Sequence, residues 1–301
     1  MADSLFGGRL VDDALGLTHN RSRDRSGTTP VGGSAVESIV ENIGENIGES
    51  SRVRHGKVVT IIPAAGHGVR MGSKKQFLKL GGIPIFVHTL RKFAGCPDVT
   101  EIYMAAPPED VPSMEETIRN EPLNKPVMVV AGGSRRQDSV ENCLRLLSAD
   151  TELVAVHDAV RPFVSLELIA AVIEEAARGG ASILGILSVD TVKQVQQTRI
   201  VGTLPRERIV LAQTPQVFRY DILKQAFEKA REESFVGTDE ASLVEHLGHE
   251  VTVVAGSARN IKITTPADLE LAGFYLQQER AGCGAVPPSI GTGAAPLQPG
   301  G

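Results

Sequence analysis

Apolar and polar positions change in blocks along residues 55–280, and the blocks predict strands and helices in turn. Unbroken apolar runs predict buried strands, whereas apolar positions three or four residues apart predict one buried face of a helix. The predicted strands are VVTIIP (58–63), EIYMAAP (101–107), PVMVVAG (126–132), ELVAVHD (152–158) and ASILGIL (181–187), and the extended runs EVTVVAG (250–256) and NIKITT (260–265) follow. The predicted helices are PIFVHTLRKFA (84–94), QDSVENCLRLLS (137–148), SLELIAAVIEEAAR (165–178) and one that begins at Pro266.

This alternation predicts an α/β fold, in which a Rossmann-like, mostly parallel sheet carries helices on both faces. Ligands of such sheets bind at the carboxyl ends of the strands, near helix N-termini. The run 189–209 alternates apolar and polar residues, and a domain of this kind does not need it to complete its sheet. It predicts a projecting β-arm.

The two ends of the chain differ from this pattern. Residues 1–54 are rich in Gly, Ser, Asn and Arg and hold few large apolar residues, and residues 281–301 are rich in Gly and Pro. Segments of this kind bury too little apolar surface to offset their ordering entropy. We therefore expect a disordered N-terminal extension (1–54), one domain (55–280) and a disordered C-terminal tail (281–301).

Composition excludes several classes of protein. A net charge of -5 and a pI near 5.9 disfavour a broad nucleic-acid-binding face, and an aromatic content of 4% disfavours base stacking. No apolar stretch is long enough to span a membrane. Cys96, Cys143 and Cys283 lie far apart, which favours reduced thiols over a zinc site or a disulfide framework. The N-terminus holds the Ser and Arg of a plastid transit peptide, but its acidic residues favour a cytoplasmic protein.

The first strand opens into a glycine-rich basic loop, PAAGHGVRMGSKKQF (63–77). Gly66 and Gly68 fit a dinucleotide fingerprint, but Met71 stands where its third glycine belongs, and no Gly-Lys-Ser/Thr triplet supports a P-loop. Arg70 and Lys75 follow the turn at once. Two cations in this position suit phosphate transfer, in which negative charge builds up on the transferred and leaving groups.

The loop resembles the nucleotide-binding motif of sugar-phosphate nucleotidyltransferases, and further blocks narrow the resemblance. They are AGGSRRQDSV (131–140), HDAVRPFV (157–164), VDTVK (189–193), QTPQVF (213–218), GTDEASLVE (237–245) and NIKITTPADLELA (260–272). Together they resemble the 2-C-methyl-D-erythritol 4-phosphate cytidylyltransferase family of the non-mevalonate isoprenoid pathway. The resemblance implies CMP transfer from CTP to 2-C-methyl-D-erythritol 4-phosphate, with release of pyrophosphate and with Mg²⁺ as cofactor.

The resemblance also implies the roles of individual residues in nucleotide binding and catalysis. Arg70 and Lys75 would stabilise the transition state, and Arg206 with Lys262 would aim the attacking phosphate oxygen. The Ser139 hydroxyl would read the cytosine edge. The expected nucleotide-binding set is Pro63, Ala64, Ala65, Gly66, Gly68, Gly132, Gly133, Ser139, Asp158 and Ala159.

The resemblance also implies which residues bind the second substrate, the phosphate that accepts CMP. The expected set for the methylerythritol phosphate is Asp158, Arg161, Thr191, Arg206, Thr214, Thr238, Lys262 and Thr264. The phosphates of CTP would hold most of the metal, with Asp158 as a candidate ligand. The arm would embrace a second subunit and complete that subunit's site, so the resemblance implies a homodimer. Pro205 stands where the family usually has Asp, which leaves the pose of Arg206 open.

Five nearby residues are expected to have roles outside substrate binding. His157 is expected to be a packed strand-end residue rather than an acid or base, and Asp239 and Glu240 are expected to cap a helix. Arg135 and Arg136 receive no role and are expected to be solvated.

Three alternatives stay open at this point. A ribitol 5-phosphate cytidylyltransferase would share the fold and nucleotide site, but VDTVKQV and TDEASLVE fit the methylerythritol enzymes better. A nicotinamide-dependent oxidoreductase is disfavoured by the glycine spacing. A catalytically silent nucleotide-binding protein is disfavoured by the presence of Arg70, Lys75, Asp158 and Lys262 together.

Overall fold

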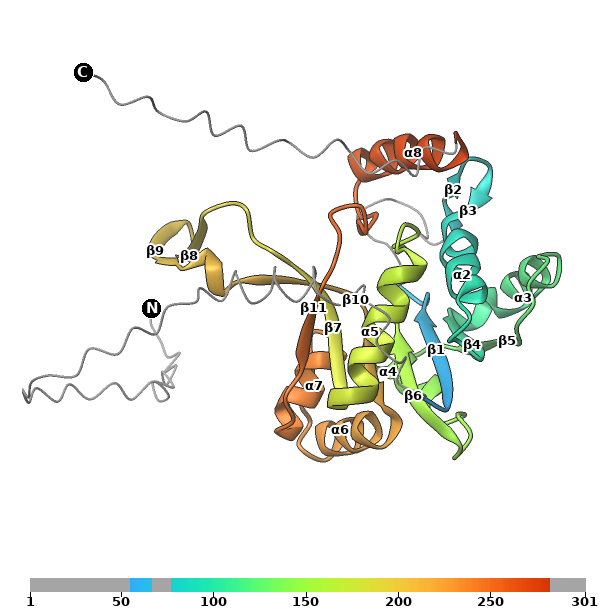
Figure 1. Ribbon diagram of the computed structural model, residues 1–301, viewed down its shortest axis with the longest axis horizontal. Helices are drawn as coiled ribbons and strands as arrows, with labels where there is room; N and C mark the ends of the chain where they lie inside the picture. Colours follow the sequence, from blue (N-terminus) through green and yellow to red (C-terminus); the bar gives the residue numbers. More distant parts are fainter. Residues whose placement is uncertain (1–54, 67–76, 282–301) are drawn as a thin grey trace, which may run out of the picture.

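A seven-stranded sheet organises the part of the chain that the computed structural model describes, residues 55–66 and 77–281 (Figure 1). Its strand order is β11-β7-β10-β6-β1-β4-β5. The strands are β1 (Lys57–Pro63), β4 (Glu101–Ala106), β5 (Val127–Ala131), β6 (Thr151–Val156), β7 (Ala181–Leu187), β10 (Val210–Arg219) and β11 (Thr252–Ala255). All five strands expected before residue 190 are therefore present.

Strand β10 is the exception to a parallel sheet. It pairs antiparallel with β6 and with β7, whereas the other neighbouring pairs run parallel. Its pairing with β7 is interrupted between Ala212 and Gln216, and Pro215 within that interval has no N–H to donate. The predicted fold class, mostly parallel α/β, is confirmed, although sequence analysis did not predict β10 as a strand.

Helices cover both faces of the sheet because its central strands are apolar on both sides. On one face, Val58 and Ile62 of β1 pack in one apolar core with Phe86 and Leu90 of helix α2 (Ile85–Gly95). On the other face, Val59 and Ile61 pack in a second core. The helices are α2 (Ile85–Gly95), α3 (Val111–Arg119), α4 (Arg136–Leu144), α5 (Leu166–Gly179), α6 (Tyr220–Glu232), α7 (Glu240–Leu247) and α8 (Pro266–Arg280), with single 3₁₀ turns at η3 (Pro108–Asp110) and η4 (Arg206–Arg208).

Local signals explain where these helices begin and end. The Ser165 hydroxyl accepts from the Leu168 N–H at the start of α5, and Gly180 ends that helix in a left-handed conformation with φ of 91°. Pro266 occupies the first turn of α8, as expected, and Thr265 caps it.

The segment between β11 and α8 differs from the extended run that was predicted there. Residues 260–265 form no strand. They are held instead by Ile263, whose N–H donates to the Val160 carbonyl and whose side chain is fully buried in a third apolar cluster. That cluster joins α8 to the short strands β2 (Lys79–Leu80) and β3 (Ile83–Pro84) through Leu80, Ile85, Phe163, Ala272 and Leu276.

The predicted arm is an antiparallel hairpin of β8 (Val192–Gln196) and β9 (Arg199–Leu204), separate from the main sheet. Figure 1 shows it projecting away from the body of the domain. Its apolar side chains are exposed: Val195, Ile200 and Val201 each show more than half of their surface.

Several expectations fall outside the described residues. These are the two predicted tails, apart from Ala281, and the part of the basic loop that holds Gly68, Arg70 and Lys75. Across residues 55–66 and 77–281, no helix has both the length and the apolar content to cross a bilayer.

The two-faced core generates a stability prediction. Phe86 on α2 is fully buried and meets the Phe77 ring edge to face at 5.5 Å. Phe86→Ala should lower the free energy of unfolding by about 3–5 kcal/mol, because it removes a large side chain from a close-packed site. Urea unfolding followed by circular dichroism measures the change. The matched control is Phe274→Ala on α8, where the ring is 54% exposed and the expected loss is below about 0.5 kcal/mol. Equal losses at the two positions would contradict this account of the core.

Candidate functional site

The predicted site residues meet where the parallel strands end. Asp158 follows β6, Gly132 follows β5, and Ala64 follows β1. The Ala64 N–H donates to the Ala105 carbonyl at 2.7 Å, and the Gly132 N–H donates to the Ala106 carbonyl at 2.7 Å. These bonds hold the loops after β1 and β5 against the end of β4. The carboxyl edge of the sheet is thus one surface rather than separate loops.

Asp158 lies at the centre of this edge, and cations from three segments surround its buried carboxylate. Lys262 Nζ is 2.7 Å from Oδ2, and Arg136 Nε donates to Oδ1 at 3.1 Å. Arg161 Nε lies 3.7 Å from Oδ2. The backbone N–H of Asp158 donates to the Thr214 hydroxyl at 3.1 Å, which ties the carboxylate to β10.

These neighbours decide the charge of Asp158. Burial alone would raise the pKa of its carboxyl, but Arg136, Lys262 and Arg161 outweigh burial and hold that pKa well below its usual value. Burial lowers the pKa of Arg161, and Asp158 opposes that change. Asp158 is therefore ionised at neutral pH, and both of its oxygens face cations.

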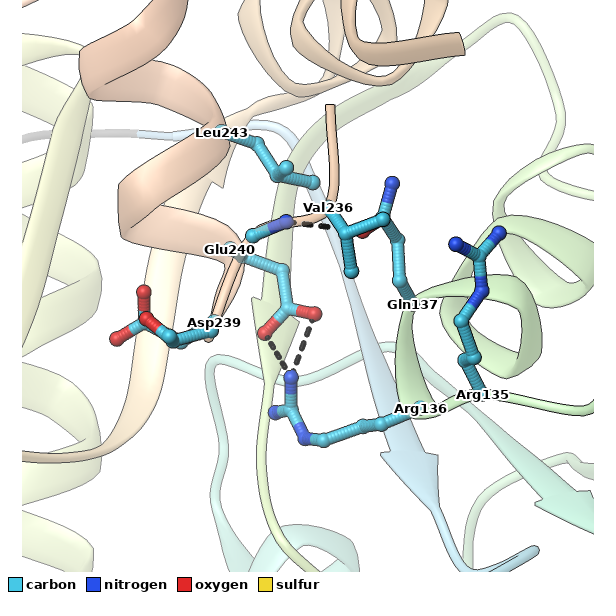
Figure 2. A pocket seen from close by; sticks show the side chains of 9 residues that line it. Arg135, Arg136, Gln137, Val236, Asp239, Glu240 and Leu243 are labelled. Carbon is cyan, nitrogen blue, oxygen red and sulfur yellow. Dashed lines mark hydrogen bonds and ion pairs between the residues drawn. The ribbon is translucent and has the colours of Figure 1, made fainter. Parts of the chain in front are cut away.

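Arg136 was expected to be solvated, but its side chain pairs with two carboxylates. Its Nη1 donates to both oxygens of Glu240, at 2.7 and 2.8 Å (Figure 2). Its Nε donates to Asp158 at 3.1 Å. Glu240 was also expected to cap α7, but Asp239 holds the N-cap position, and Glu240, the first residue of the helix, is buried and pairs with Arg136. Burial raises the pKa of Glu240, and the arginine opposes that rise. Arg136 thus joins the start of α4 to both carboxylates.

The flanking residues agree better with sequence analysis. Arg135 is exposed and binds Asp138 at 2.7 Å in the first turn of α4. Asp239 caps α7 by accepting from the Ser242 N–H at 3.0 Å, as expected. Arg135 and Asp239 both line a cavity of about 120 Å³. Its other lining residues are Arg136, Gln137, Val236, Gly237, Thr238, Glu240 and Leu243.

The loop expected to read the base is closely packed. A side chain on Gly132 would come within 2.9 Å of the Ser139 hydroxyl and 3.2 Å of the Ala106 carbonyl, so glycine is required there. Ser139 is buried, donates to the Arg135 carbonyl at 3.0 Å and accepts from the Gly133 N–H at 3.1 Å. Its hydroxyl shapes the loop, and its expected contact with cytosine stays a prediction.

His157 has the packed position that was expected. Its Nε2 lies 3.0 Å from the Arg161 carbonyl, which can only accept, so Nε2 carries the proton. Nδ1 then accepts from the Thr214 hydroxyl at 3.1 Å. Burial lowers the pKa of His157 to about 4, so the ring is neutral at physiological pH. The histidine orients Thr214 and carries no exchangeable charge near neutrality.

The structure brings together some of the residues expected to bind the methylerythritol phosphate and places others apart. Asp158, Arg161, Thr214 and Lys262 form the cluster described above. Arg206 lies on the arm, where it donates to the Val189 carbonyl at 3.0 Å, and Thr191 is exposed at the base of the same arm. Thr238 and Thr264 lie at the starts of α7 and α8, where the Thr238 N–H donates to Ser242 and the Thr264 hydroxyl to Asp268.

A metal site built from protein side chains needs several ligands close together. In the described part of the chain, no three His, Cys, Asp or Glu side chains lie close enough together to hold a metal ion. Asp158, the candidate ligand, already faces Lys262 and Arg136. The arrangement suits a carboxylate that holds cationic side chains in place.

Comparison with known proteins adds independent findings. The family model for 2-C-methyl-D-erythritol 4-phosphate cytidylyltransferase matches residues 58–278. A protein of that name from Solibacter usitatus is 54% identical over 238 residues, which cover 75% of this chain and 98% of the relative. Another of that name, from Acidobacterium capsulatum, is 47% identical over 234 residues, which cover 74% of this chain and 98% of the relative.

Solved structures give the same result. The crystal structure of 4-diphosphocytidyl-2C-methyl-D-erythritol synthase from Anaerococcus prevotii matches with a TM-score of 0.66 at 31% identity, over 74% of this chain and 99% of that chain. The crystal structure of 2-C-methyl-D-erythritol 4-phosphate cytidylyltransferase from Thermus thermophilus matches with a TM-score of 0.61 at 36% identity, over 73% of this chain and 99% of that chain.

The Arg136–Glu240 pair generates a prediction. Arg136→Met should lower the free energy of unfolding by about 3–5 kcal/mol at neutral pH, because it leaves the buried Glu240 carboxylate without its cation. The deficit should narrow as the pH falls from about 8 to about 5, since a carboxyl whose folded-state pKa is raised binds its proton more readily in the folded protein. Urea unfolding at several pH values measures both effects.

Two further variants control this experiment. Arg136→Met/Glu240→Gln removes the uncompensated charge and should recover most of the loss. Arg178→Met removes an exposed arginine that pairs with Glu174 and Glu175, and should change stability by at most about 1 kcal/mol. A deficit in Arg136→Met that is as small as in Arg178→Met, or that grows at acid pH, would show that the pair is not a buried one.

Proposed function

The chain belongs to the 2-C-methyl-D-erythritol 4-phosphate cytidylyltransferase family, and on that premise we propose that it transfers CMP from CTP to 2-C-methyl-D-erythritol 4-phosphate. It is a nucleotidyltransferase of isoprenoid biosynthesis, and the products are 4-diphosphocytidyl-2-C-methyl-D-erythritol and pyrophosphate. Ribitol 5-phosphate is not favoured as acceptor, because the related proteins carry the name of the methylerythritol enzyme.

The observation that carries this proposal is the pairing of Lys262 with Asp158. The ammonium group is anchored at 2.7 Å by a buried carboxylate, while the lysine side chain remains 44% exposed. Lysine has three N–H donors, so the anchor leaves donors for a phosphate. A cation that is fixed in place yet accessible is what an incoming phosphate monoester requires.

The proposed reaction is an in-line displacement. An oxygen of the acceptor phosphate attacks the α-phosphorus of CTP, a new P–O bond forms, and the bond to the bridging oxygen breaks to release pyrophosphate. A phosphate monoester is largely a dianion at neutral pH, so its attacking oxygen has no proton to lose. This explains how the site can work beside a neutral, buried His157.

The roles of single residues follow the same proposal. Arg70 and Lys75 neutralise the charge that builds on the α-phosphate and pyrophosphate. Lys262 holds the acceptor phosphate, and Arg206 approaches it from an arm. Bound Mg²⁺ would supply further charge neutralisation on the triphosphate. Because the Asp158 oxygens are already paired, the phosphates of CTP would be its main ligands.

We propose further that the chain acts as a homodimer in the cytoplasm. Val195, Ile200 and Val201 expose apolar surface on a projecting hairpin, which a second subunit would cover. Arg206 lies at the base of this hairpin, where it contacts Val189 and Glu207. The cytoplasm is supported by three cysteines whose positions suggest no disulfide framework.

The proposed function makes a direct prediction. Purified full-length protein with Mg²⁺ and CTP should release pyrophosphate in the presence of 2-C-methyl-D-erythritol 4-phosphate. ATP, GTP and UTP should be poor donors, and ribitol 5-phosphate should be a poor acceptor. Coupled pyrophosphate detection measures each pair. Faster release with ribitol 5-phosphate would overturn the proposed acceptor, and no release with either would overturn the proposed activity.

A second prediction concerns the basic loop. Arg70→Ala and Lys75→Ala should each lower kcat by about 100-fold to 1,000-fold with a modest change in CTP binding, because each removes charge stabilisation that matters most in the transition state. Steady-state kinetics and calorimetric CTP titration separate the two quantities. The matched controls are Arg178→Ala, which removes an exposed cation that pairs with Glu175, and Lys92→Ala, which removes a partly exposed cation that pairs with Glu279. Both should leave kcat unchanged. Near-normal kcat in a loop variant would refute its role.

A further inference from the structure

Lys262 lies in a segment whose backbone has few fixed points. Residues 256–265 join β11 to α8 without forming a strand (Figure 1). The Gly256 N–H donates to the Gly185 carbonyl at 2.8 Å, and Ile263 is held by Val160 at 3.0 Å. Between these two points, regular pairing does not set the position of the lysine. Side-chain hydrogen bonds from the segment must therefore supply what a strand would otherwise provide.

Asn260 supplies such bonds. Its side chain is fully buried, and its amide Nδ2 donates to the Thr214 carbonyl at 2.9 Å and to Gln213 Oε1 at 3.2 Å. Its backbone carbonyl accepts from Arg161 Nη1 at 2.7 Å. The buried Oδ1 of Asn260 has no hydrogen-bond partner among the described residues, so the contacts of its Nδ2 and of its backbone carbonyl define its position.

Gln213 completes this anchor from β10. Its Nε2 donates to the Ser257 carbonyl at 2.8 Å, which leaves its Oε1 to accept from Asn260. A side chain on Gly256 would come within 2.5 Å of that Oε1, so the two segments are packed too closely for a larger residue. The amide groups of Asn260 and Gln213 therefore connect β10 to both ends of the turn that precedes Lys262.

Two partners of Asn260, Thr214 and Arg161, are also partners of Asp158. The Thr214 hydroxyl accepts from the Asp158 N–H, and Arg161 faces the Asp158 carboxylate. The contacts consequently form a closed circuit, from Asp158 through Thr214 to Asn260 and on to Lys262, whose ammonium returns to Asp158 at 2.7 Å. A change at Asn260 would alter where the ammonium sits relative to the carboxylate.

We propose that Asn260 is a positioning residue, which sets the place of the Lys262 ammonium and thereby the affinity for the acceptor phosphate. The inference rests on the proposed function. It assigns Asn260 an effect on the binding of methylerythritol phosphate and none on CTP, because its contacts to Gln213, Thr214 and Arg161 include none of the residues expected to bind the nucleotide. It also explains the need for an amide: a carboxylate of the same shape would set an acceptor against the acceptors on Thr214 and Gln213.

The test is a double-mutant cycle of Asn260→Ala and Lys262→Met, read out as the dissociation constant for 2-C-methyl-D-erythritol 4-phosphate. Isothermal titration calorimetry measures it on the full chain loaded with Mg²⁺ and a non-reacting CTP analogue. In the wild-type background Asn260→Ala should weaken acceptor binding by about 10-fold, which corresponds to about 1.4 kcal/mol. In the Lys262→Met background the same change should weaken it by less than about 2-fold. Binding of the CTP analogue should not change.

Three further measurements keep the outcome unambiguous. Asn260→Asp should weaken acceptor binding at least as much as Asn260→Ala. Asn142→Asp, which alters an amide that donates to the Ala131 carbonyl away from the cluster, should leave it unchanged. Thermal melting checks that each variant is folded at the temperature of the titration.

The possible outcomes separate this inference from the proposed function. Failure of the wild-type protein to bind the acceptor would overturn the proposed function. Wild-type binding with equal losses from Asn260→Ala in both backgrounds would overturn the positioning role alone. So would unfolding of both Asn260 variants, because that result would make Asn260 a residue of general stability.

Discussion

The buried carboxylate of Asp158 is the constraint on which the site depends. A charge removed from water is costly unless other charges and hydrogen bonds compensate it. The compensation comes from Arg136 at the start of α4 and from Arg161 and Lys262, which lie in segments without regular structure. Because Arg136 and Lys262 are distant from Asp158 in sequence, the carboxylate can be fully satisfied only when the whole carboxyl edge of the sheet has assembled. The same interaction thus links folding of the edge to formation of the site.

Strand β10 shows how the sheet serves this constraint. A parallel strand would begin at the opposite edge of the sheet and reach the carboxyl edge only at its end. Strand β10 is antiparallel, so it begins at the carboxyl edge, directly after the arm. Its irregular interval brings Thr214 next to the Asp158 N–H and leaves the Thr214 carbonyl for Asn260. The interruption in pairing therefore leaves the Thr214 hydroxyl and carbonyl free to hold Asp158 and Asn260.

Sequence analysis succeeded where local pattern decides the outcome. The unbroken apolar runs became the central strands, and Asp158 and Lys262, which motif resemblance singled out, lie together. Sequence analysis failed where the position of a residue depends on a partner far along the chain. Arg135 and Arg136 are adjacent and chemically alike, but Arg136 finds Glu240, which lies 104 positions further along the chain. The run NIKITT alternates like a strand, yet its residues bond to side chains and a loop. Neither partner is visible in the local pattern.

The charges of the cluster explain why an anion should bind there. Arg136, Arg161 and Lys262 carry three positive charges, Asp158 and Glu240 carry two negative ones, and His157 is neutral with a pKa of about 4. One positive charge is left over at neutral pH. Glu240 and Asp158 are buried, whereas Lys262 is the most exposed of the three cations, so the excess is presented to solvent there. A phosphate at Lys262 would complete the charge balance that the protein alone leaves unfinished.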